Sequence, residues 1–321
     1  MERSDRPVFE YLRLSVTDRC NLRCVYCMPA EGLPKLTHDQ VLRYEEMLGI
    51  VRACAAEGVH RVRLTGGEPL VRKGLCGFVT SLAAIPGIDD ISLTTNGILL
   101  PGMAKPLREA GVSRVNISLD SLQSDRYAAI TRGGDIRLVL DGIRAAIEAG
   151  LAPVKINVVL IPGRNDDEIE EFGRLACRLP VHVRFIERMP FATDDANTAS
   201  YISQDTIMDR LDRAGIRLAA SEAPSGGGPA DTFRIDGEAG FIGFISSRSH
   251  PFCSRCTRLR LTVGGTLLPC LDSRDGIDVR GLDHNSIRSA IHELAKRKRA
   301  AHKACARFLD APCVSLSDIG G

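Results

Sequence analysis

Apolar and polar residues alternate in two recurring patterns over the first 190 positions of the chain. Short, mostly apolar runs predict buried strands, and apolar residues spaced three and four apart predict amphipathic helices. Strands are expected at residues 11–16, 59–65, 91–95, 112–119, 154–161 and 181–187. Helices are expected at residues 37–57, 75–84, 124–130, 136–149 and 166–178, the first beginning with a Thr37–Gln40 capping box.

Six strands joined through helices by short connections predict an α/β fold with a parallel sheet, whose ligands bind at the carboxyl ends of the strands. Polar motifs follow three of these strands. They are Arg63-Leu64-Thr65-Gly66-Gly67-Glu68-Pro69, Thr94-Thr95-Asn96-Gly97 and Asn116-Ile117-Ser118-Leu119-Asp120-Ser121. Gly66 and Gly67 could let the backbone approach a ligand, although a glycine pair is also common in ordinary turns.

The pattern changes after the sixth strand. Residues 192–230 are rich in turn formers around one helix near residues 204–214, and two further strands are expected at 232–235 and 241–246. We therefore expect three parts: a barrel over residues 1–190, a crossing or hinge segment over 191–230, and a C-terminal segment over 231–321.

The composition is that of a soluble globular chain, with 321 residues of which 44% are hydrophobic and 26% charged. The net charge of +2 gives no global field for a polyanion, so we expect no nucleic-acid partner. No apolar run approaches the length of about 18 residues that a membrane helix requires, and no secretory signal is evident. We expect a cytoplasmic protein, in which the eleven cysteines indicate metal binding and not disulfides.

Three of these cysteines, Cys20, Cys24 and Cys27, lie in one short segment after the first strand. Thiolates at this spacing bind zinc or an iron–sulfur cluster. Three ligands leave one coordination position open, which a small molecule could fill, whereas a structural zinc site normally has four protein ligands.

A second group of three consists of Cys253, Cys256 and Cys270. The alternation over residues 257–263 places Arg258 and Arg260 on one face of a strand beside these cysteines. Taken alone, this segment is equally compatible with a zinc ribbon that has an exposed basic edge.

The spacing C-x3-C-x2-C, with Tyr26 before the last cysteine, resembles the signature of the radical S-adenosylmethionine (SAM) superfamily. Over nearly its whole length the chain resembles one family within it, the GTP 3′,8-cyclases of molybdenum cofactor biosynthesis. The motifs that carry this second resemblance are Leu12 to Asn21, Thr65 to Leu70, Phe185 to Pro190, Phe252 to Cys256, Arg258 to Thr262 and the terminal Gly320-Gly321.

The resemblance implies an incomplete (βα)6 TIM-like barrel whose open side is closed by the C-terminal segment. It implies a [4Fe–4S] cluster on Cys20, Cys24 and Cys27 that cleaves SAM, and a second on Cys253, Cys256 and Cys270 that presents an open iron to guanine. The residues expected to contact SAM are Tyr26, Gly66, Gly67, Glu68, Ser118 and Met189. The deoxyadenosyl radical would remove the ribose 3′ hydrogen of GTP, after which C3′ would attack C8.

A triphosphate needs cationic partners, and arginine binds phosphate oxygens bidentately. The expected substrate-binding residues are Arg13, Arg63, Thr94, Lys155, Arg184, Arg258 and Arg260. Each cation could instead pair with one of the 40 acidic residues at the surface. Arg13, Arg258 and Arg260 are also expected to act in catalysis, together with Gly320 and Gly321, which in the family insert towards the active site.

The resemblance also implies a low-potential electron donor of the flavodoxin or ferredoxin type, a homodimer, and transfer of the product to cyclic pyranopterin monophosphate synthase. Two other hypotheses remain at this point. One is a peptide-modifying radical SAM maturase with auxiliary clusters, which usually needs more C-terminal cysteines. The other is a non-catalytic zinc scaffold, which would bind zinc and be colourless.

Overall fold

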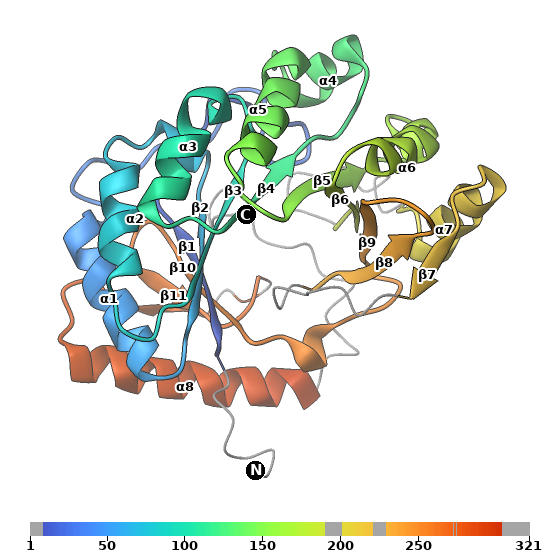
Figure 1. The fold of residues 1–321 in the computed structure, drawn as a ribbon. Helices are drawn as coiled ribbons and strands as arrows, with labels where there is room; N and C mark the ends of the chain where they lie inside the picture. The colour runs from blue at the N-terminus through green and yellow to red at the C-terminus, as the bar shows by residue number, and fades with distance from the viewer. Residues whose placement is uncertain (1–8, 190–200, 221–228, 272, 274, 304–321) are drawn as a thin grey trace.

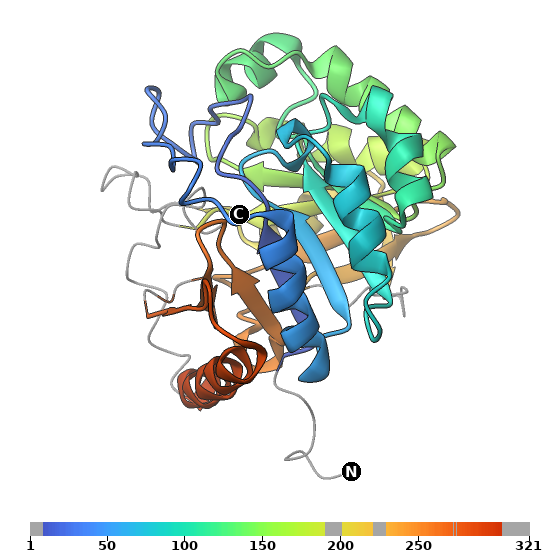
Figure 2. The ribbon, with the colours of Figure 1, turned by 90° about the vertical axis from the view of Figure 1, so that its left-hand side faces the viewer.

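The computed structural model describes residues 9–189, 201–220, 229–271, 273 and 275–303. Its centre is a parallel sheet of six strands that lie side by side in chain order. These strands are β1 (Tyr11–Ser15), β2 (Arg61–Thr65), β3 (Asp90–Thr95), β4 (Arg114–Ser118), β5 (Val154–Leu160) and β6 (Val181–Glu187). Figures 1 and 2 show the curved sheet with helices on its outside.

The C-terminal part of the chain adds strands to both edges of this sheet. β10 (Arg258–Leu261) pairs parallel with β1, and β9 (Phe241–Ile245) pairs parallel with β6. Antiparallel strands follow outside them: β11 (Thr266–Leu268) and β12 (Ile277–Asp278) beyond β10, and β8 (Asp231–Ile235) and β7 (Leu218–Ala220) beyond β9. The strand order is open, which confirms the predicted α/β fold with an incomplete barrel.

Alternation along the strands gives the sheet two different faces. Side chains such as Leu14, Leu64 and Ile117 are fully buried in one hydrophobic cluster with residues of the surrounding helices. Their neighbours along each strand, among them Arg63 and Asn116, are buried too but polar. Because successive side chains of a strand point to opposite faces, the apolar set packs under the helices and the polar set faces the barrel interior.

Eight helices accompany the sheet in the described residues. They are α1 (Tyr44–Ala56), α2 (Leu75–Ala83), α3 (Leu100–Ala110), α4 (Ser124–Thr131), α5 (Ile136–Glu148), α6 (Ile169–Arg178), α7 (Gln204–Arg213) and α8 (His284–Lys303). In Figure 1, α8 crosses the lower end of the molecule, and Figure 2 shows it end-on beside α1.

The structure corrects the expected helix over residues 37–57, which begins at Tyr44. The Thr37 amide does donate to Oε1 of Gln40, at 3.0 Å, but this bond closes an isolated turn. The helix is capped instead by Glu46, whose carboxylate accepts from the Arg43 amide at 2.7 Å. Arg43 is not a residue of the usual capping-box motif, so the sequence pattern pointed to the wrong start.

Several elements were not predicted. α3 contains Gly102 and Pro106, residues that normally argue against a helix, yet its buried face packs beside α5. The short strands β7, β11 and β12 and the long helix α8 were also missed. By contrast, the helix expected near residues 204–214 is confirmed as α7, and its segment also forms β7, with Leu211 and Ile216 packed against α6.

Gly142 on α5 allows the close packing of this helix, because a Cβ atom there would lie 2.3 Å from the carbonyl oxygen of Gly97. We predict that Gly142→Ala lowers the free energy of unfolding by about 1–3 kcal/mol. The control is Gly49→Ala on α1, where no atom lies within 4 Å of the added Cβ. It should raise stability by about 0.5–1 kcal/mol. Urea unfolding of the reduced apoproteins measures both, and a shift in the same direction for the two variants would contradict the packing argument.

Candidate functional site

The segment that carries Cys20, Cys24 and Cys27 leaves the carboxyl end of β1 and is fastened by two arginines. Nη1 of Arg23 donates to the carbonyl oxygens of Cys20 and Leu22, both at 2.9 Å. Nη1 of Arg132 donates to the carbonyl oxygens of Arg23 at 2.9 Å and Met28 at 2.7 Å. We refer to residues 20–27 as the cysteine loop. Its backbone is held at both ends without using the thiols.

The three thiols of the cysteine loop are half-buried. Burial raises the pKa of Cys24 well above its usual value, and nearby Asp120 and the other two thiols raise it further. The thiols are therefore neighbours. A four-iron cluster binds each thiolate through a different iron and can leave its fourth iron open, so three thiols in one short loop fit such a cluster, whereas a structural zinc site normally has four protein ligands.

Tyr26 links the cysteine loop to the end of β4. Its hydroxyl donates to Oδ2 of Asp120 at 2.7 Å, and Oδ1 of Asp120 accepts from the Val159 amide at 2.9 Å. Burial raises the pKa of Asp120 to about 6. Asp120 was not predicted as a site residue, although it stands in the polar motif after the fourth strand.

Gly66 and Gly67 pack directly against the backbone that leads into the cysteine loop. The amide of Gly67 donates to the carbonyl oxygen of Thr17 at 2.7 Å. A Cβ atom on Gly67 would lie 2.3 Å from the carbonyl oxygen of Arg19, and one on Gly66 would lie 2.5 Å from that of Thr17. Both positions therefore require glycine for this close approach.

Glu68 is 1% exposed and uses both carboxylate oxygens inside the protein. Oε2 accepts from the Asn96 amide at 2.7 Å, and Oε1 accepts from the Thr95 hydroxyl at 2.8 Å and the Leu70 amide at 3.0 Å. Burial raises the pKa of Glu68 to about 7. This carboxylate connects the ends of β2 and β3. It therefore supports the structure of the site, whereas the sequence predicted only a contact with SAM.

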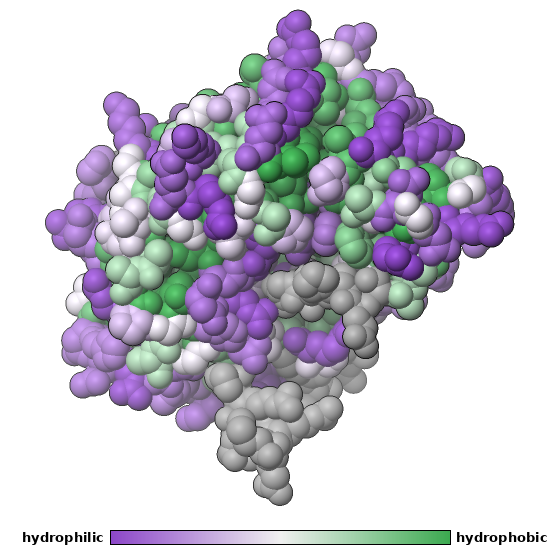
Figure 3. Space-filling model, in the orientation of Figure 1, coloured by the Kyte–Doolittle hydropathy of each residue, from purple (hydrophilic) through white to green (hydrophobic). Residues whose placement is uncertain are grey.

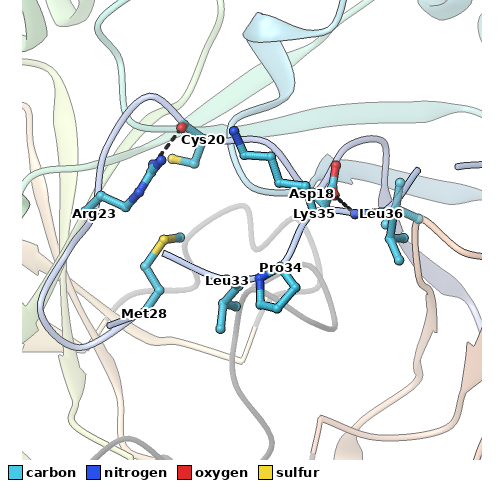
Figure 4. Close-up of a pocket in the computed structure, with 9 residues that line it drawn as sticks. Asp18, Cys20, Arg23, Met28, Leu33, Pro34, Lys35 and Leu36 are labelled. Carbon is cyan, nitrogen blue, oxygen red and sulfur yellow. Dashed lines mark hydrogen bonds between the residues drawn. The ribbon is translucent and has the colours of Figure 1, made fainter. Parts of the chain in front are cut away.

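A pocket opens beside Cys20, at the edge where the parallel strands end. Its lining residues are Asp18, Cys20, Arg23, Met28, Leu33, Pro34, Lys35, Leu36 and Val263. Figure 4 shows Met28, Leu33 and Pro34 across the pocket from Cys20 and Arg23. Ser118 at the end of β4 and Met189 just after β6 are half-buried at the same edge of the sheet.

The polar inner face of the sheet is ordered in rows by the strand register. Arg13 stands between Arg260 on β10 and Arg63 on β2. Thr94, Asn116 and Lys155 form a second row, and Ser118, Asn157 and Arg184 a third. The register thus gathers cations from five strands, β10, β1, β2, β5 and β6, which are widely separated in the sequence.

Arg63 and Arg184 have only neutral hydrogen-bond partners, and Lys155 has none among the described residues. Nε of Arg63 donates to the Ser92 hydroxyl at 3.2 Å, and Arg184 donates to Oδ1 of Asn157 at 3.0 and 2.6 Å. In the described part of the chain, no carboxylate forms an ion pair with Arg63, Lys155 or Arg184.

The cations destabilise one another. Burial, followed by Arg184 and Arg63, lowers the pKa of Lys155 to about 7. Burial and then Arg63 lower the pKa of Arg184 to about 9. Burial, Arg260 and Arg63 lower the pKa of Arg13. Buried positive charge of this density is costly unless an anion joins it, so the inner face fits an anionic ligand.

Two residues of the inner face were not assigned from the sequence. Asn116 is fully buried, and neither its amide nitrogen nor its amide oxygen has a partner among the described residues. Gly243 on β9 stands opposite Arg184, where a Cβ atom would lie 2.9 Å from Cγ of the arginine. Asn116 is thus available to a ligand beside Thr94 and Lys155, and Gly243 leaves room for the arginine side chain.

The second cysteine group lies at the opposite ends of the strands, where β10 begins and β11 ends. Cys253 begins a single 3₁₀ turn, Cys256 follows it, and Cys270 follows β11. Nε of Arg258 donates to Sγ of Cys256 at 3.3 Å, and Nζ of Lys298 lies 3.6 Å from the same sulfur. Burial alone would raise the pKa of Cys256, but Arg258 and Lys298 outweigh it and lower the pKa to about 6. The site therefore favours a thiolate, the form that binds metal.

The structure places the first cysteine group after the end of β1 and the second where β10 begins, and it gathers the expected cations Arg13, Arg63, Lys155, Arg184, Arg258 and Arg260 on the inner face of the sheet. Gly320 and Gly321 lie outside the described residues. None of the described helices is long and apolar enough to cross a membrane, and on the face in Figure 3 hydrophilic side chains project around the rim. Lys298 was missed because its role depends on where α8 packs.

The open parallel sheet, with three cysteines after its first strand, defines a radical SAM protein. The model of the radical SAM superfamily matches residues 14–176, and that of Molybdenum Cofactor Synthesis C matches residues 181–304. The chain is similar to SuiB of Streptococcus suis in its precursor-peptide complex, with a TM-score of 0.61, 14% identity and coverage of 88% of this chain and 67% of that one. At 14% identity, this similarity to SuiB is evidence for a shared fold only.

Relatives of much higher identity define the family. The GTP 3′,8-cyclase of Pelotomaculum thermopropionicum is 49% identical over 97% of both chains. That of Moorella thermoacetica is 53% identical over 84% of both. The chain belongs to the radical SAM superfamily and, within it, to the GTP 3′,8-cyclase family.

The close contact of Gly67 with the cysteine loop predicts a loss of iron in Gly67→Ala. The test uses protein with Cys253, Cys256 and Cys270 replaced by Ala, so that only the first site can hold a cluster. Because overpacking costs about 1–3 kcal/mol, iron binding should weaken roughly tenfold. Gly77→Ala on α2, which meets no atom within 4 Å, is the control. Equal iron content after reconstitution of both variants would refute the prediction.

Proposed function

We propose that this enzyme converts GTP to (8S)-3′,8-cyclo-7,8-dihydroguanosine 5′-triphosphate in molybdenum cofactor biosynthesis, using SAM and two [4Fe–4S] clusters. The observation that supports it most is the basic inner face, which lies between two groups of three cysteines. A radical SAM domain needs only the first cysteine group. The second group and the row of arginines beside it support a further cofactor and an anionic substrate.

Cys20, Cys24 and Cys27 would hold the first cluster, leaving one iron for SAM. Bound there, the cluster and SAM supply one-electron cleavage chemistry that removes a hydrogen atom from the ribose 3′ carbon. The proposed SAM contacts are Tyr26, Gly66, Gly67, Ser118 and Met189. Glu68 is proposed to act indirectly, because its two oxygens already bond to the ends of β2 and β3.

Arg13, Arg63, Lys155, Arg184, Arg258 and Arg260 would bind the triphosphate and orient the nucleoside. Arginine forks suit phosphate oxygens, and a buried interior strengthens each contact by excluding water. Thr94 lies in the same row as Lys155, and its buried hydroxyl has no partner within the described part of the chain, so it is proposed to bind the substrate. Cys253, Cys256 and Cys270 would hold the second cluster, facing guanine from the β10 side.

Three further parts of the proposal come from the family resemblance. They are an electron donor of the flavodoxin or ferredoxin type, a homodimer, and transfer of the product to cyclic pyranopterin monophosphate synthase. Gly320 and Gly321 are proposed to reach the active site.

The direct test is anaerobic reconstitution with iron and sulfide, followed by SAM, dithionite and GTP. Formation of 5′-deoxyadenosine together with a cyclised GTP product is expected. Formation of 5′-deoxyadenosine while GTP stays intact would reject the substrate, and binding of zinc alone would reject the reaction class.

Removing one cation from the inner face should weaken substrate binding while leaving both cysteine groups intact. Because a hydrogen bond to a charged group contributes about 1.5–3 kcal/mol, Arg184→Met should weaken GTP binding roughly tenfold to a hundredfold. Arg178→Met, an exposed position at the end of α6, is the matched control. Equilibrium dialysis without SAM measures binding, and iron content should be the same in both variants. Equal GTP affinity would remove Arg184 from the substrate site.

The lowered pKa of Lys155 predicts that GTP binding depends on pH. Its pKa is about 7 in the ligand-free structure, and a bound triphosphate would raise it. Below pH 7 the lysine is charged with or without GTP, so affinity is highest there. As the pH rises above 7, binding must take up a proton, and affinity falls by up to about tenfold per pH unit until the pKa of the bound form is reached.

The arginine variant provides the reference for this measurement. Lys155→Arg stays charged over the same pH range, so the ratio of its affinity to that of the wild type cancels the ionisation of GTP itself. The affinity of Lys155→Arg for GTP, divided by that of the wild type, should increase between pH 7 and 9. A ratio independent of pH would show that Lys155 does not bind the phosphates as a charged group.

A further inference from the structure

Lys298 on α8 is a buried lysine beside the second cysteine group. It is 2% exposed, and its ammonium group bonds to three acceptors. Nζ lies 2.8 Å from the carbonyl oxygen of Arg258, 2.7 Å from that of Pro269 and 3.6 Å from Sγ of Cys256. All three hydrogens of the ammonium group are thus used.

These acceptors belong to the two backbone segments that carry the ligands. Arg258 stands two residues after Cys256, and Pro269 immediately precedes Cys270. These segments enter and leave the β10–β11 hairpin, so one side chain from a distant helix fixes the distance between them. The bonds of Lys298 therefore constrain where two of the three proposed ligands lie.

The charge of Lys298 also needs a partner. Its surroundings include the ring of Phe9, whose centre lies 5.4 Å from Nζ. Among the described residues, no Asp or Glu forms an ion pair with it. The nearby groups that can carry negative charge are the thiols of Cys256 and Cys270. A buried ammonium group without an opposite charge nearby destabilises the protein. An anionic, thiolate-ligated metal centre beside it would compensate that charge.

We propose that Lys298 is a positioning residue for the second cluster: it spaces Cys256 and Cys270 and stabilises the negative charge of the cluster. The proposal rests on the proposed function, because it assumes a cluster at this site. Hydrogen bonds to cluster sulfurs and nearby charge set how readily a cluster is reduced. A lysine at this place makes the reduced, more negative state easier to reach.

The test uses full-length protein with Cys20, Cys24 and Cys27 replaced by Ala, so that all bound iron belongs to the second site. Lys298→Met and Lys298→Arg are compared with Lys296→Met, an exposed position on the same helix. The readouts are the rate of iron loss to a chelator and the reduction potential from a dye-mediated titration. Neither depends on turnover.

Lys298→Met should lose iron roughly tenfold to a hundredfold faster than the parent, in line with the usual effect of removing a partner that supports a metal ligand. Its reduction potential should be more negative. Lys298→Arg, which keeps the charge, should restore the potential at least in part, and Lys296→Met should match the parent in both readouts.

If Lys298→Met behaves as Lys296→Met does, the role of Lys298 is refuted while the second cluster stands. If the parent itself binds no cluster, the proposed second cluster fails, and this inference fails with it. Should Lys298→Met not fold, Lys298→Gln replaces it, since its amide keeps two N–H donors without the charge. A potential for Lys298→Gln equal to that of the parent would also overturn the proposal.

Discussion

The structure depends on positive charge buried on the inner face of a parallel sheet. The outer face of the same strands is apolar and packs under helices, which provides the stability of the fold. The inner face instead carries Arg63, Lys155 and Arg184, and in the described residues no carboxylate neutralises them by an ion pair. Such a face is stable only because the rest of the sheet supports it, and its charge is compensated when an anion binds.

The two cysteine groups are tied to this face by different means. The first is fastened by backbone contacts of Gly66 and Gly67 and by the bond between Tyr26 and Asp120. The second is placed by the parallel pairing of β10 with β1, which sets Arg260 beside Arg13. Residues more than 240 positions apart thereby form one wall, so that the N-terminal and C-terminal parts of the chain contribute to a single site.

Much of this arrangement could be predicted from the sequence. The buried strands have apolar runs strong enough to locate all six, and the cysteine spacings predict two metal sites. The helix α3 could not be predicted because tertiary packing outweighs the unfavourable effects of Pro106 and Gly102. Glu68 was expected as a ligand contact, yet only the structure shows its oxygens bonded to neighbouring loops.

Three residues, Asn116, Lys298 and Gly243, were missed for the same reason. The role of each depends on residues that a distant element places beside it. Asn116 looks like an ordinary strand residue until the register sets it between Thr94 and Lys155. Lys298 is one of several cations on α8, and only the packing of that helix brings it to Cys256. Gly243 could be read as a weak strand position, but it makes room for Arg184.

Both cysteine groups and the basic face are proposed to act on one substrate, GTP. The most direct test is to supply the reconstituted enzyme with SAM, dithionite and GTP that carries deuterium at the ribose 3′ carbon. We expect the 5′-deoxyadenosine formed to contain deuterium and its amount to match that of the cyclised product. Unlabelled 5′-deoxyadenosine, formed at the same rate with and without GTP, would contradict this proposal.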